Sequence, residues 1–120
     1  MTYEEINLMI AAIAEALGCG YSYYTNNEAE VVKTPFLLFD YPERDDVFAD
    51  NTNYQKKEVL SIEYDSAKRD LDAETIIEDA LNENGLSYDK TSTYIDGENA
   101  FETMYTMQVM IKNVTTNEEM

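Results

Sequence analysis

The stretch AFETMYTMQVMIK, residues 100 to 112, alternates between two sets of side chains and predicts a long β-strand. One set is mainly apolar (Phe101, Tyr105, Met107, Val109 and Ile111), and the other is mixed (Glu102, Met104, Thr106, Gln108 and Met110). The segment Leu86 to Ile95 precedes it across a turn at residues 96 to 99, where Asp-Gly is a strong hairpin signal. We therefore expect the chain to close with an antiparallel hairpin.

Three more strands are expected upstream of this hairpin. Tyr21 to Thr25 is short and aromatic, and Phe36 to Tyr41 is apolar at both alternating positions, which predicts a central strand covered on both faces. Lys57 to Tyr64 has the period of a half-buried strand, with Leu60, Ile62 and Tyr64 on one face. Between the last two, Glu43 to Gln55 predicts a long loop, and loops of that length are commonly functional.

Two amphipathic helices complete the pattern. The first begins at a capping box of Thr2 and Glu5, ends at Gly18, and carries an apolar stripe of Ile6, Met9, Ile10, Ile13 and Leu17. The second runs from Asp72 to Asn84, with Asp72 as its N-cap, Leu71 and Ile76 as a hydrophobic staple, and Gly85 as its stop. Its apolar face is Ile76, Ile77, Ala80 and Leu81, and its solvent face is Glu74, Glu78, Asp79 and Glu83.

The element order α-β-β-β-α-β-β predicts an α+β fold, a mainly antiparallel sheet with two helices packed on it. We expect a single domain over residues 1–112 and a flexible polar tail over 113–120. The longest apolar run, Pro35 to Phe39, is too short to span a bilayer, and the N-terminus lacks the cationic region of a secretory signal. These features predict synthesis in the cytoplasm and no membrane partner.

The chain is strongly acidic: 8 Lys and Arg against 25 Asp and Glu give a net charge of −17, and there is no histidine. Affinity for phosphate backbones comes mainly from Lys and Arg that displace counterions, so this charge argues against nucleic-acid binding. The ten tyrosines could stack on bases, but stacking platforms work together with a basic groove. We therefore assign the tyrosines to sheet packing and to contacts between proteins.

No catalytic, cofactor or metal motif stands out in the sequence. Without histidine there is no Ser-His-Asp or Cys-His arrangement, the four glycines form no phosphate-binding loop, and Cys19 has no metal-ligand spacing around it. The acidic stretch from Asp45 to Asn51 lacks the spacing and the central glycine of an EF-hand, so a loop that offers Phe48 and Tyr54 as contacts is favoured over a calcium site. The expectation is a non-enzyme with no cofactor and no metal.

The order of motifs resembles the tail-terminator, or tail-completion, proteins of long-tailed phages and prophages. The resemblance is carried by Phe36 to Phe39, by Phe48, Asp50, Asn51 and Tyr54, by Leu60 to Tyr64, and by Tyr88-Asp89-Lys90 before Tyr94-Ile95. It implies a structural virion protein that forms a hexameric ring, caps the tail tube and meets the head-tail connector. It also implies a location in the host cytoplasm during assembly and in the virion tail afterwards.

The resemblance also suggests which surfaces make contacts. Ring or docking contacts are expected at Phe48, Asp50, Asn51 and Tyr54, and secondly at Met104 and Met110 on the mixed face of the last strand. DNA must pass through such a ring without binding to it, and acidic walls repel phosphate. Candidate channel-facing acids are Glu43, Asp45, Asp46, Glu74, Glu78 and Asp79.

A different class of function fits the same composition. A small acidic protein can mimic DNA and occupy the basic groove of a host DNA-binding protein. Such a mimic needs carboxylates in rows at phosphate-like spacing, whereas a ring subunit needs apolar contact patches. A third possibility is a cellular protein-interaction domain with no phage connection, and the sequence alone leaves all three interpretations open.

Overall fold

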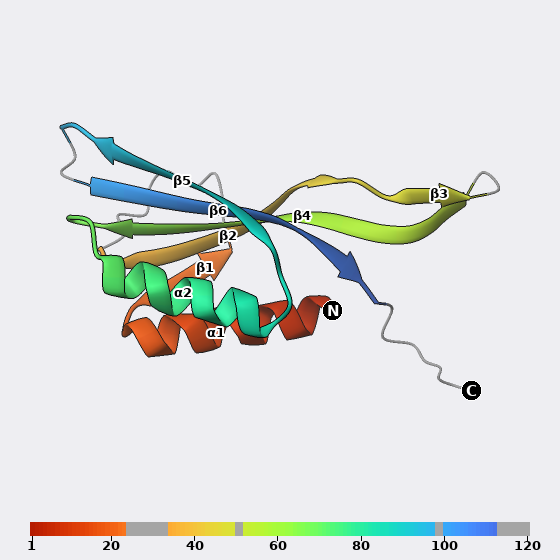
Figure 1. Cartoon of the computed structure of the whole chain (residues 1–120), viewed down its shortest axis with the longest axis horizontal. Helices are drawn as coiled ribbons and strands as arrows, with labels where there is room; N and C mark the ends of the chain where they lie inside the picture. The colour runs from red at the N-terminus through yellow and green to blue at the C-terminus, as the bar shows by residue number, and fades with distance from the viewer. Residues whose placement is uncertain (24–33, 50–51, 98–99, 113–120) are drawn as a thin grey trace.

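The computed structural model describes residues 1–23, 34–49, 52–97 and 100–112 (Figure 1). Over these residues it contains six strands: β1 (Gly20–Tyr23), β2 (Phe36–Arg44), β3 (Val47–Ala49), β4 (Thr52–Ser66), β5 (Tyr88–Ile95) and β6 (Ala100–Ile111). They form a sheet in the order β1-β2-β4-β6-β5, and β3 pairs with β4 beyond the end of β2. β1 is parallel to β2, and every other pairing is antiparallel, so the predicted α+β class is confirmed.

Helices α1 (Tyr3–Leu17) and α2 (Leu71–Glu83) lie side by side under one face of this sheet, as Figure 1 shows. The capping box of α1 is confirmed, because the Glu5 amide donates to Thr2 Oγ1 at 3.1 Å and the Thr2 amide donates to Glu5 Oε1 at 2.8 Å. Gly18, with φ of 70°, ends the helix in the left-handed conformation. Neither helix in the described part of the chain is long and apolar enough to cross a bilayer.

Helix α2 begins earlier than the sequence predicts. Asp70 is its N-cap and accepts a hydrogen bond from the Ala73 amide at 3.1 Å, so the prediction of Asp72 as the cap is wrong. Both aspartates can cap a helix. In the structure Asp70 is the cap, and the residues Ala73, Ile77 and Leu81, which are spaced by four positions, face the core.

Two other predictions for α2 are also wrong. With Asp70 as the cap, Leu71 and Ile76 do not occupy the staple positions, and Ile76 is 37% exposed. Glu74, predicted to point to solvent, is instead buried at 2% exposure.

The core fills the space between the helices and the near face of the sheet. Its fully buried members come from both helices and from the three middle strands: Ile6, Ile10, Leu37, Leu60, Ile62, Ile77, Leu81 and Tyr105. The alternation predicted for residues 100–112 is confirmed, because Tyr105, Met107, Val109 and Ile111 face the helices. The last strand therefore anchors the sheet to the helical layer.

The prediction for Phe36 to Tyr41 is right about strand structure and wrong about coverage. β4, and not β2, is the middle strand of the sheet. Leu37 and Phe39 are buried against the helices, but Leu38 on the opposite face is only half-buried, because no described element covers that face. We call this uncovered surface of β2, β4, β6 and β5 the open face.

The predicted loop at Glu43 to Gln55 is wrong. β2 continues to Arg44, β3 follows almost at once, and both pair with the long strand β4, so this region is a two-stranded arm that projects beyond the helices (Figure 1). The molecule is consequently elongated, with extents of 51 × 26 × 26 Å. The alternating pattern that would have predicted these strands is broken by register shifts between Asp40 and Glu43 and between Val47 and Phe48.

Candidate functional site

The arm carries the most exposed aromatic residue of the part that the structure describes. Phe48 in β3 is 71% exposed, and its neighbour Val47 is 38% exposed. The other contacts predicted here are not placed: Asp50 and Asn51 lie outside the described residues, and Tyr54 is placed in β4 only by its backbone. The structure therefore supports an apolar contact surface on the arm through Phe48 and Val47.

The mixed face of the last strand is the open face of the sheet. Met104 is half-buried and pairs in register with Glu63 of β4, which in turn pairs with Leu38 of β2. Met110 lies farther along, opposite Lys57, and is 38% exposed. Both predicted methionine contacts thus lie where another molecule could reach them.

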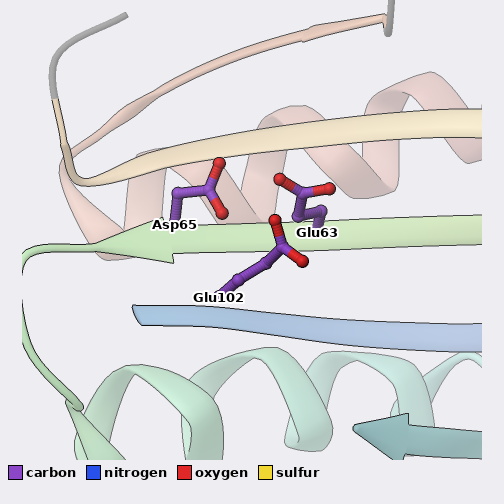
Figure 2. A group of neighbouring side chains, drawn as sticks. All are labelled: Glu63, Asp65 and Glu102. Carbon is purple, nitrogen blue, oxygen red and sulfur yellow. The ribbon is translucent and has the colours of Figure 1, made fainter. Parts of the chain in front are cut away.

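A group of three carboxylates lies on this open face, and the sequence reasoning missed it. Glu63, Asp65 and Glu102 point toward one another from β4 and β6, and one oxygen of each lies within 4.8 Å of the others (Figure 2). Alternation along β4 places Glu63 and Asp65 on one face, which the sequence shows. The pairing of Glu102 with Asp65, however, depends on the register of two strands that are far apart in the chain.

The electrostatic state of this group follows from its surroundings. Partial burial, a hydrogen bond with Asp65 and repulsion from Asp65 and Glu102 raise the pKa of Glu63 well above its ordinary value. The raised pKa favours the protonated form of Glu63 near neutral pH. Three carboxylates at this spacing could also ligate a hard cation such as Ca²⁺, so the expectation of no metal remains a prediction.

A hollow of about 260 Å³ lies beside the carboxylates on the open face. Its wall is apolar on two sides, at Leu38 and Met104, and polar at Asp40, Ser61 and Glu63. Ser61 pairs in register with Asp40 across the two strands, and the described residues show no further group that would activate its hydroxyl. The composition of the hollow suits a side chain of another protein better than a reacting substrate.

The six predicted channel acids divide into two groups. Glu43, Asp45 and Asp79 are exposed. Asp46 is held by Arg44 at 2.6 Å with its side chain 5% exposed, Glu78 is half-buried, and Glu74 is buried. Of the six, these three are the exposed ones, and Asp45 accepts a hydrogen bond from Gln108 at 3.3 Å.

The inner acids of α2 belong to an ionic network with β5. Lys90 Nζ lies 2.6 Å from Glu74 Oε1 and 2.7 Å from Glu78 Oε2, and the Tyr105 hydroxyl donates to Glu78 at 2.9 Å. Burial opposes the ionisation of Glu78, but the hydrogen bonds from Lys90 and Tyr105 outweigh it and lower its pKa. The hydrogen bonds that Lys90 makes to Glu74 and Glu78 raise the pKa of this lysine. The network fixes α2 to the sheet.

Cys19 follows the end of α1 and is half-buried. Burial raises the pKa of its thiol, which disfavours the nucleophilic thiolate. Whether the chain is an enzyme is not tested by these observations, so the expectation of a non-enzyme stays a prediction.

A comparison of the chain with models of known protein families and with curated protein sequences finds no match.

Proposed function

We propose that this chain is a structural subunit of a phage or prophage tail, a tail terminator that assembles into a ring on the end of the tail tube. The observation that supports this proposal best is the two-stranded arm with Phe48 exposed on it. The arm packs against neither helix in the described structure and adds nothing to the core. Its extension is therefore best explained by a contact with another molecule.

The energetics favour such a contact. Removing a large apolar side chain from water contributes about 1.5–3 kcal/mol, and Phe48 is still 71% exposed in the single chain. In a ring this gain in free energy recurs at every interface, because the arm of each subunit contacts the next subunit. The open face of the next subunit, with Leu38, Met104 and Met110, offers apolar surface that such an arm could contact.

The exposed acids suit the same proposal. Glu43 and Asp45 lie at the base of the arm, and Asp79 lies on α2. Carboxylates turned toward a central channel would repel the passing DNA and keep it from binding to the wall. A ring with these acids on its outer rim would contradict this part of the proposal.

The test is the native mass of the purified protein by light scattering, alone and after mixing with isolated tail tubes. We expect a hexamer, either free or bound to the tube ends, and we expect Phe48→Ser to prevent it. Leu71→Ser is the matched control, because Leu71 is 61% exposed on α2, away from the arm. A protein that stays monomeric with tubes present contradicts the proposal.

The alternative, an acidic DNA mimic, makes the opposite prediction. It would act as a monomer and would inhibit a host restriction enzyme at nanomolar concentration. The three carboxylates on the open face form a tight cluster and not a row, and this arrangement gives no support to a mimic.

A further inference from the structure

The outer surface of the helical layer has an apolar groove, whose floor includes the core residues Met9 and Ile13. α1 and α2 run in opposite directions along it (Figure 1). A hollow of about 370 Å³ lies between them, and its apolar floor comes from Met9, Ala12, Ile13 and Ala16 of α1 and Ile76 and Ala80 of α2. A second hollow of about the same volume adjoins it at Met9 and Asn84 and extends the groove to Leu8.

Apolar side chains border this groove on its solvent side. Leu8 is 63% exposed and Ile76 is 37% exposed. Leu8, Ala12 and Ala16 are spaced by four residues and form one stripe along α1, next to the stripe that faces the core. The small alanine side chains keep the floor low, so that another backbone could approach α1 closely.

The rim of the groove is acidic. Asp79 and Glu83 border it on α2, and Glu5 borders it at the start of α1. Neither α1 nor α2 contains a lysine or an arginine. A helix favours cations in its last turn, yet Glu15 and Glu83 occupy the last turns of α1 and α2. Glu83, which borders the groove, breaks this local preference, and such a departure points to a role for the groove outside the single chain.

We propose that this groove binds an amphipathic helix of a partner protein, one with an apolar stripe flanked by lysine or arginine. The apolar stripe packs on Ala12, Ala16 and Ile76, and the cations pair with Asp79 and Glu83. This is the helix-in-groove mode of recognition, read by apolar anchors at intervals of three and four residues. The proposal goes beyond the ring and does not depend on it, and it assigns Asp79 to the partner helix in place of the channel wall.

Charge complementarity favours a basic helix over the other possible occupants of the groove, a second copy of the chain or a lipid surface. A second copy of the chain would bring its own acidic helices, and an anionic lipid surface would bring its phosphates, so both would be repelled by Asp79 and Glu83. A basic helix gains from the same acids. It also places its cations beside the carbonyl groups at the C-terminus of α2.

The test uses the full chain and a synthetic helical peptide of about 18 residues, with leucines at intervals of three and four and lysines beside them. Titration calorimetry should show saturable binding of one peptide per chain, weakened by salt. The double variant Asp79→Lys/Glu83→Lys should bind at least about tenfold more weakly. Ile76→Ser should lose a comparable factor, because it removes an anchor from the floor.

Two controls separate the groove from the overall charge. Asp89→Lys/Asp96→Lys makes the same change in net charge at exposed positions in and next to β5, and it should alter the affinity by about twofold at most. A peptide of the same composition in scrambled order should bind weakly. The proposal is overturned if the helical peptide does not bind, if the scrambled peptide binds as well, or if the control variant loses as much affinity. It is also overturned if Ile76→Ser dissociates a homo-oligomer, because the occupant is then a second copy.

Discussion

The carboxyl group of Glu63 should make this protein less stable as the pH rises. Its pKa is raised to about 9 in the folded chain, and that of an unfolded glutamate is about 4.3. Between these two values the folded state binds a proton that the unfolded state does not bind. The contribution of Glu63 to the free energy of unfolding is therefore fully present below about pH 4.3 and is lost as the pH rises toward 9. Glu63→Gln keeps the size and the hydrogen-bonding capacity of the side chain and removes this titration.

The magnitude follows from the number of protons involved. One full proton gives a slope of about 1.4 kcal/mol per pH unit. Solvent reaches the half-buried cluster and hydrates part of the charge, so we expect about half of that slope, or roughly 1.4 kcal/mol between pH 6 and pH 8. The Gln variant should show almost no slope in this window, so it should gain about 1.4 kcal/mol of stability on the natural chain between pH 6 and pH 8.

Urea unfolding followed by circular dichroism at several pH values measures this directly. Glu15→Gln is the matched control, because Glu15 is exposed on α1 and far from the open face, and its pH dependence should equal that of the natural chain. A natural chain with no slope between pH 6 and pH 8, or a Gln variant with the same slope, would refute the assignment of a raised pKa to Glu63.

Three further predictions concern the packing of α2 on the sheet. Lys90→Met should destabilise the fold by about 2 kcal/mol in urea unfolding. The reason is that Glu74 remains buried and keeps only its longer contact with Arg69, at 3.3 Å. An unchanged unfolding midpoint would contradict the ionic network. Ile77→Ala should cost about 3 kcal/mol in the same assay, because Ile77 is fully buried and the cavity left behind cannot close. Gly85→Ala should lower stability by about 1 kcal/mol through the backbone alone, because φ is 72° and a methyl group would meet nothing within 4 Å; a loss several times larger by thermal unfolding would mean a steric role.

The sequence predicted most of the helices and strands because their signals are local. The capping box at Thr2, the stop at Gly18 and the alternation in residues 100–112 depend on neighbours a few positions away. The prediction failed for α2 where two capping aspartates compete, and for the arm where register shifts break the alternation. In α2 the choice between the two aspartates is not set by the local pattern, and in the arm the pairing with β4 forms strands that the broken alternation hides.

The candidate surfaces were harder to predict. Phe48 and Met110 are exposed and Met104 is half-buried, and the positions of the two methionines follow from their face of the strand. That these residues make contacts remains a prediction. Glu74 was misassigned, because only the position of Lys90 on β5 explains why an acid on that helix turns inward. Phe48 was predicted as a contact residue on a loop, but in the structure it lies on a strand of the projecting arm.

By itself, the sequence determined the acidic charge, the α+β class and the faces of most elements, because composition and period are properties of neighbouring residues. Tertiary structure alone decided what those faces meet. It put Glu102 beside Glu63 and Asp65, set the helices against each other to leave a groove, and carried β3 and β4 past the body of the fold. The physical reason is that strand register and helix packing are fixed by contacts between residues far apart in the chain, and no local pattern records them.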